Sequence, residues 1–123
     1  MNKKNRKYDL EDRLIDYAVR VVNVSERLSE TKAGKHVAGQ LLRSGTSPAP
    51  NYGEAQSAES PKDFIHKIKI SLKELRESKI WLKIIVRAKL IQPSLLEPLI
   101  QESDELIAIL FKSVDTAKKN MER

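Results

Sequence analysis

Apolar residues recur along this chain at intervals of three and four residues, in four separate segments. This spacing places the apolar side chains of each segment on one side of an α-helix. It predicts helices at about residues 9–29, 32–57, 60–91 and 94–120. Since the connections between segments are short, neighbouring helices must run antiparallel. We therefore expect an all-α protein, an up-down-up-down four-helix bundle, with a single domain at residues 8–123.

The segment 60–91 is the longest of the four and would make about nine turns of helix. Ser60 can cap its N-terminus, and Pro61 suits the first helical position, where a missing N–H group costs nothing. Ser94 and Glu97 have the spacing of a capping box that would open the next helix. The predicted core face of 60–91 steps by three and four residues, as in the seam of a bundle. Its members are Phe64, Ile68, Leu72, Leu75, Leu82, Val86 and Leu90.

A second apolar strip runs along the same segment, outside the predicted core face. A helix that packs only inside a monomeric bundle needs one apolar stripe. The second strip therefore predicts that this helix also packs against another copy of the chain. The predicted self-association residues are Ile70, Ile80, Trp81 and Ile84.

The segment 32–57 is the least regular of the four. It contains all four glycines of the chain, together with Pro48 and Pro50. Each proline removes a backbone donor and clashes with the preceding turn. We expect the second helix to be kinked or broken near these prolines. The alternative is an ordinary loop between two short helices.

Charge is distributed unevenly over the chain, whose formal net charge is +6. Residues 1–7 carry four basic side chains and no acidic one, which predicts a disordered basic arm. Residues 60–91 carry nine basic and three acidic side chains, whereas the first and last helices are net acidic. Such polarity suits an anionic partner, or neighbouring subunits whose acidic helices meet basic ones.

Six of the basic side chains fall on one side of the 60–91 helix. They are Lys62, Lys69, Lys73, Arg76, Lys83 and Arg87. Such a row can follow a phosphate backbone and give salt-dependent, largely sequence-independent affinity. Only Trp81 offers an aromatic ring nearby, so base stacking is not indicated. A solvated face, or ion pairs with acidic helices of a neighbouring subunit, are the alternatives.

The sequence carries no enzyme signature. Asp63 and His66 have the spacing of a di-iron ligand pair, but such a site needs the pair twice and two further inward carboxylates. Glu74 and Glu77 could serve acid–base chemistry, yet such carboxylates more often pair with neighbouring lysines, here Lys73 or Lys67. No phosphate-binding loop is present. We therefore expect no metal site, no cofactor and no catalytic activity.

Membrane insertion and secretion are not expected either. No stretch reaches the roughly 18 consecutive apolar residues of a membrane span, and no apolar signal region follows the basic N-terminus. The absence of cysteine removes disulfides and thiolate metal sites. These features predict a cytoplasmic protein that makes no contact with a membrane.

The central part of the chain resembles the bacterial "four helix bundle protein" family, also called 23S ribosomal RNA intervening-sequence proteins. The close match covers roughly Gln40 to Ile91 and includes the ordered run Leu42-Arg43-Ser44-Gly45-Thr46-Ser47. Pro48 and Pro50 depart from the family pattern. The matching polar residues are either functional or serve as polar links between the second and third helices. They are Arg43, Ser47, Asn51, Glu54, Asp63, Lys67 and Glu74.

The resemblance implies a closed bundle that assembles into a homopentamer. It also implies similarity to the accessory variability determinant of diversity-generating retroelements, a pentameric basic bundle that binds a reverse transcriptase and nucleic acid. Residues and resemblance together predict a non-enzymatic oligomer that binds RNA or DNA, or a nucleic-acid enzyme such as a reverse transcriptase, through its basic helix. The alternative is a protein-interaction scaffold that binds no nucleic acid.

Overall fold

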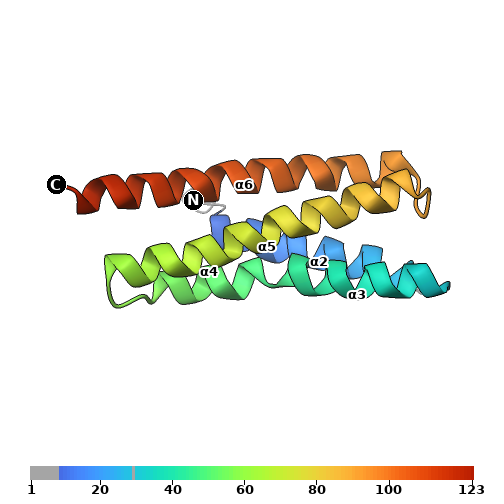
Figure 1. Cartoon of the computed structure of the whole chain (residues 1–123), viewed down its shortest axis with the longest axis horizontal. Helices are drawn as coiled ribbons and strands as arrows, with labels where there is room; N and C mark the ends of the chain where they lie inside the picture. The colour runs from blue at the N-terminus through green and yellow to red at the C-terminus, as the bar shows by residue number, and fades with distance from the viewer. Residues whose placement is uncertain (1–8, 29) are drawn as a thin grey trace, which may run out of the picture.

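The computed structural model describes residues 9–28 and 30–123, so the predicted basic arm lies outside the described residues. The described chain is helical, without strands, and its helices lie side by side along one long axis (Figure 1). The elements are α2 (Leu10–Glu26), α3 (Lys32–Thr46), α4 (Pro48–Gln56), α5 (Pro61–Arg87) and α6 (Pro93–Met121). Together α3 and α4 form the second helix of the bundle. The predicted all-α, up-down-up-down four-helix bundle is confirmed.

The second helix breaks at the predicted place. Only Ser47 separates α3 from α4, and it keeps helical dihedral angles (φ −73°, ψ −36°), so the ordinary loop is not formed. The Asn51 side-chain amide donates to the carbonyl and the hydroxyl oxygen of Ser47, at 3.0 and 2.9 Å. Ser71 of α5 donates its hydroxyl to the carbonyl of Pro48 at 2.9 Å. The prolines therefore produce a kink that local and interhelical hydrogen bonds hold in place.

The starts of three helices have polar caps. Asp9, Thr31 and Ser60 each accept a hydrogen bond from the backbone N–H three residues later. The predicted cap at Ser60 is therefore confirmed. The capping box predicted for Ser94 and Glu97 is wrong, because α6 begins one residue earlier, at Pro93, without a side-chain cap. Proline at the first helical position fixes that start.

The third helix ends four residues before its predicted end. It stops at Arg87, and Lys89 adopts a left-handed conformation with φ 60°. The N–H of Leu90 donates to the carbonyl of Ile85, and that of Lys89 to the carbonyl of Val86, both at 3.0 Å. This is the Schellman arrangement, which closes a helix and turns the chain back. Here it directs the chain toward α6.

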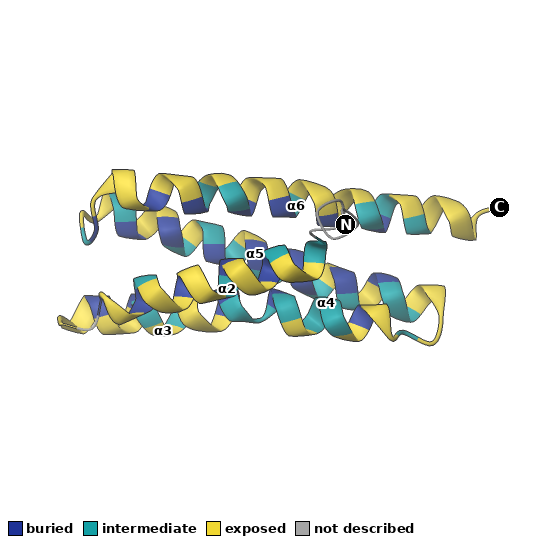
Figure 2. Ribbon diagram, turned by 180° about the vertical axis from the view of Figure 1, so that it is seen from behind, coloured by how far each residue is buried: buried dark blue, intermediate teal, exposed yellow. Residues whose placement is uncertain are grey.

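The core lies between the helices, with buried residues on their inner sides and exposed residues outside (Figure 2). On α5, Ile65 and Ile85 are buried, whereas the predicted core members Phe64, Val86 and Leu90 are only half-buried. These three residues still pack against the core. The burial of Ile65 and Ile85 was not predicted, because α5 packs against α3 and α4 on one side and α6 on the other. The buried face is therefore wider than one seam. The buried residues of α5 are Ile65, Ile68, Ser71, Leu72, Leu75, Ser78, Leu82 and Ile85.

Close helix packing depends on small residues. A Cβ atom at Gly45 would lie 2.7 Å from the side chain of Val21, so α2 and α3 approach at this point. Tyr17 of α2 is fully buried, and its hydroxyl lies 2.7 Å from that of Ser78 on α5, the diagonal partner in the bundle. Because Ser78 donates to the carbonyl of Leu75 at 2.9 Å, Tyr17 is the donor to Ser78. Among the described residues, no buried side-chain nitrogen or oxygen lacks a partner.

Helix α2 covers only part of the bundle (Figure 1). It has 17 residues, whereas α6 has 29, a difference of roughly 18 Å in length. Arg13, near the start of α2, bonds to Glu102 and Glu105 of α6. Since the two helices run antiparallel, the C-terminal half of α6 extends beyond the described part of α2.

Candidate nucleic-acid interface and self-association surface

The six predicted nucleic-acid-binding residues all lie exposed on α5. We call Lys62, Lys69, Lys73, Arg76, Lys83 and Arg87 the basic face. Within the described residues none of the six makes an ion pair. By contrast, Lys67 pairs with Glu54 at 3.4 Å, and Lys79 pairs with Asp104 of α6. Lys67 and Lys79 are thus neutralised by neighbouring helices, whereas the six cations of the basic face have no acidic partner among the described residues.

Helix α6 brings a further cation to this face. The positive charge of Lys118 lowers the pKa of Lys69, so the two ammonium groups lie close to one another. Like charges at such a separation repel, and an anion between them would remove the repulsion. Lys118 is exposed and makes no ion pair among the described residues. The sequence interpretation missed Lys118 because it considered the basic helix alone.

An aromatic side chain also borders the basic face. Phe111 of α6 is 56% exposed. It lies seven residues from Asp104, which pairs with Lys79, and seven from Lys118, which lies against Lys69. Seven residues are two helical turns, so all three residues of α6 share the side next to α5. Phe111 is therefore a second aromatic residue to consider beside Trp81, and the spacing 104–111–118 in the sequence indicates its side of α6.

The predicted self-association strip divides into two parts. Ile80 and Ile84 are 58% and 38% exposed and line a shallow groove of about 420 Å³ with Lys83, Arg87 and Ala88. Ile70 and Trp81 are half-buried. The outward residues Ile80 and Ile84 form what we call the α5 patch, an apolar surface set among the cations of the basic face.

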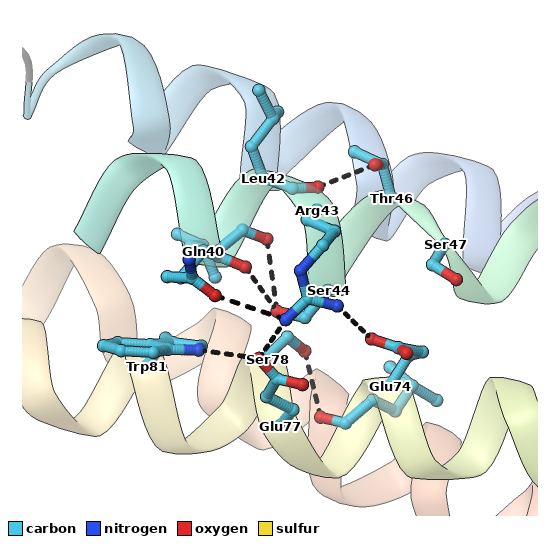
Figure 3. A network of polar contacts seen from close by, with 12 residues as sticks. Gln40, Leu42, Arg43, Ser44, Thr46, Ser47, Glu74, Glu77, Ser78 and Trp81 are labelled. Carbon is cyan, nitrogen blue, oxygen red and sulfur yellow. Dashed lines mark hydrogen bonds and ion pairs between the residues drawn. The ribbon is translucent and has the colours of Figure 1, made fainter. Parts of the chain in front are cut away.

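Trp81 belongs to a polar network that joins α5 to α3 (Figure 3). Its Nε1 donates to Glu77 at 3.1 Å, and its ring meets that of His36 edge-on, with centroids 5.9 Å apart. Arg43 of α3 donates to Glu74 at 3.0 Å and also pairs with Glu77. The carboxylates of Glu74 and Glu77 therefore pair with an arginine of another helix. The lysine partners expected from sequence are wrong.

Residues 6–112 match the sequence pattern that defines the 23S rRNA-intervening sequence protein family. The chain belongs to this family. Its fold is similar to the crystal structure of a protein with unknown function from the S23 ribosomal protein family of Bacteroides thetaiotaomicron VPI-5482. The two are 34% identical, over 85% of this chain and 97% of that chain, with a TM-score of 0.81. Among curated proteins, none matches the chain significantly.

The polar residues on which the family resemblance rested, from Arg43 to Glu74, all contact other parts of the same chain. Arg43 and Glu74 join α3 to α5, and Lys67 joins α5 to Glu54 of α4. Lys67 also lies 3.8 Å from Asp63 of its own helix. Ser47 and Asn51 hydrogen-bond each other at the break between α3 and α4. These contacts are polar links between the second and third helices, or within one of them.

Two further findings concern the described residues of this family member. No group of three or more His, Asp or Glu side chains lies close enough to hold a metal ion. Asp63 pairs with Lys67, and His66 is exposed. None of the described helices is both long and apolar enough to cross a membrane.

Proposed function

We propose that this protein is a non-enzymatic, cytoplasmic homo-oligomer that binds RNA or DNA through the basic face of α5. The observation that carries the proposal is a row of six exposed cations without ion pairs on one helix. Helix α5 has 27 residues, so the row extends over roughly 40 Å. This length allows contacts with several consecutive phosphates of a nucleic acid. The likeness to a family named after ribosomal RNA agrees with such a partner.

The oligomer in this proposal is a homopentamer, as the family resemblance implies. The α5 patch supports self-association, because Ile80 and Ile84 are exposed next to each other and line a groove on the surface of one helix. The chain mass is 14.0 kDa, so a pentamer would weigh roughly 70 kDa. Sedimentation equilibrium distinguishes these masses.

Salt dependence tests nucleic-acid binding. If all six cations contact phosphates, the slope of log K against log salt is about −4 for a single strand and about −5 for a duplex. Replacing Lys62, Lys69 and Lys73 together by glutamine removes three contacts and should reduce the slope's magnitude by about 2 to 3. The measurement is a binding titration of a structured RNA at several salt concentrations.

The matched control replaces Arg20, Lys32 and Lys35 by glutamine. These three are exposed and lie on α2 and α3, and their loss changes the net charge equally. The control should leave the slope as it is in the unaltered protein. Equal slopes for the two triple variants, or an affinity of the unaltered protein that ignores salt, would contradict the proposal.

A protein-interaction scaffold is the second candidate, and the α5 patch within the basic face favours it. In that case the cations meet acidic surfaces of neighbouring subunits, or of an enzyme such as a reverse transcriptase. Reversing the charges of Lys62, Lys69 and Lys73 to glutamate separates the candidates. Loss of the oligomer with unchanged nucleic-acid affinity supports the scaffold. Loss of nucleic-acid affinity with the oligomer intact supports the first proposal.

A further inference from the structure

A second apolar surface lies on the outer sides of α2 and α3. Ile15, Val19 and Val22 of α2 are 44%, 52% and 38% exposed. They are four and three residues apart, so they share one side of the helix. Leu42 of α3 is 40% exposed. We call these four residues the α2–α3 strip.

The register of the two helices brings Leu42 next to this row. Val21 lies opposite Gly45, and Ser25 donates to the carbonyl of Ala38. Leu42 lies between Ala38 and Gly45 in the sequence, so it is level with Val22. The strip is therefore continuous across two helices, and none of its four members belongs to the buried core.

Acidic side chains border the α2–α3 strip. Glu11 and Asp12 lie one turn before Ile15, and Glu26 lies one turn after Val22; all three acids are exposed. The basic residues of α2 lie elsewhere. Arg13, Arg20 and Arg27 are spaced seven apart, which places them on the side where Arg13 pairs with Glu102 of α6.

The residues that border the α5 patch carry the opposite charge. Arg76 lies one turn before Ile80, and Lys83 and Arg87 lie one turn after Ile80 and Ile84. All three cations are exposed. Glu77 is the one acid nearby on α5, and it pairs with Arg43. The border of the α5 patch is thus basic, whereas the border of the α2–α3 strip is mainly acidic, with Lys35 of α3, seven residues before Leu42, as the exception.

We propose that the α5 patch of one copy packs against the α2–α3 strip of the next copy. This inference rests on the self-association proposed above and specifies the two surfaces that meet. If each surface met its own counterpart, Arg87 would face arginine and Glu26 would face glutamate, and like charges opposed across an interface cost several kcal/mol. Pairing the two different surfaces buries all six apolar side chains and opposes unlike charges. Such a head-to-tail contact repeats from copy to copy until a ring closes.

The inference divides the basic face between two tasks. Arg76, Lys83 and Arg87 border the α5 patch and lie at the contact between copies. Lys62, Lys69 and Lys73 precede it along α5, toward the end where Lys118 of α6 lies. These remain on the outside of the assembly, so three of the six cations in each assembled copy are left to contact phosphates, and nucleic-acid binding and assembly can be altered separately.

Two variants with one damaged surface each provide the test. Val19→Asp damages the α2–α3 strip, and Ile80→Asp damages the α5 patch. Each variant alone should be monomeric by sedimentation, because a head-to-tail contact needs both surfaces. An equimolar mixture should form a dimer of roughly 28 kDa, twice the chain mass, since each variant supplies the surface that the other lacks.

Leu95→Asp is the control, because Leu95 is 50% exposed on α6 and belongs to neither surface. It should assemble like the unaltered protein. Circular dichroism melting should show all three variants folded, and Val19→Gln and Ile80→Gln repeat the test with a milder change. A mixture that stays monomeric, or a Val19→Asp variant that assembles normally, overturns the inference and leaves self-association standing. An unaltered protein that is monomeric at every concentration overturns both.

Discussion

Lys89 adopts an unfavourable backbone conformation in the connection between α5 and α6. Its φ of 60° lies in the left-handed region, where a side chain with a Cβ atom is strained by about 1–2 kcal/mol. Glycine is the usual residue at this position of a Schellman motif. The chain has lysine there, and the hydrogen bonds of Lys89 and Leu90 still form.

Lys89→Gly should therefore stabilise the protein. We expect the free energy of unfolding to rise by about 1 kcal/mol, because glycine adopts this conformation without strain. Urea denaturation measures the change. The control Lys112→Gly lies at an exposed position inside α6 and should lower the same free energy by about 1 kcal/mol. A loss of stability at Lys89 would contradict the conformation described for it.

Tyr17 gives a second prediction for one residue. Burial raises its pKa to about 12 from the ordinary value of 10.0. The unfolded chain therefore loses the phenol proton first as the pH rises. The contribution of Tyr17 to the free energy of unfolding is complete below pH 10 and should fall by about 2–3 kcal/mol as pH rises through 12.

Denaturation of Tyr17→Phe at several pH values checks this effect. The variant should be less stable at pH 7 by about 1 kcal/mol, since the hydrogen bond to Ser78 is lost. Its free energy of unfolding should decline less steeply than that of the unaltered protein above pH 10. Parallel curves for the two proteins would show that Tyr17 is not the group responsible.

At the scale of single helices, the sequence predicted the N-terminal cap correctly for α5 and wrongly for α6. Ser60 precedes α5, whereas Ser94 is the second residue of α6, and each serine is followed by an acid three residues later. Only Ser60 acts as a cap, because Pro93 lies before Ser94 and draws the start of α6 one residue earlier. Local sequence alone does not show whether a serine cap or a proline at the first helical position determines where a helix starts.

Replacing each serine by alanine distinguishes the two helix starts. Ser60→Ala should lower the free energy of unfolding by about 1 kcal/mol, because the N–H of Asp63 loses its acceptor. Ser94→Ala serves as the matched control and should change it by less than about 0.5 kcal/mol. Thermal or urea denaturation measures both, and equal losses would mean that Ser94 caps α6 after all.

Periodicity predicted the helices, the short connections predicted their antiparallel order, and the two prolines predicted the break near Pro48 and Pro50. It could not predict partners on other helices, because those depend on how far one helix slides along another. Arg43 therefore pairs with Glu74 and Glu77, although lysines lie nearer to these two carboxylates in the sequence. The α2–α3 strip was missed for a related reason. Whether Val19 is covered or exposed depends on where α3 lies beside α2.

At the scale of the whole molecule, assembly should strengthen nucleic-acid binding without adding a new contact. A ring presents several copies of Lys62, Lys69 and Lys73 to one long strand, so the copies bind it jointly. Ile80→Asp, which should be monomeric, keeps these lysines. We expect it to bind a long RNA about 100-fold or more weakly than the assembled protein.

An oligonucleotide short enough to contact one subunit provides the internal comparison. Its affinity should be nearly the same for Ile80→Asp and for the unaltered protein, because only one copy of the basic face is used. Fluorescence anisotropy with short and long labelled strands measures both values. An equal loss of affinity for the short and the long strand would mean that Ile80 affects nucleic-acid binding directly and not through assembly.

The limited length of α2 makes the bundle uneven in thickness. Where α2 is present, four helices exclude water from the core, but the described chain offers only three around the last turns of α6 and the first turns of α5. Fewer neighbours mean less buried surface to oppose local opening, so this end should fray first. Lys62, Lys69 and Lys118 lie at this same end. A nucleic-acid backbone bound across these lysines would hold the start of α5 and the end of α6 together. Binding would then stabilise this end of the bundle, and a folded end would in turn favour binding.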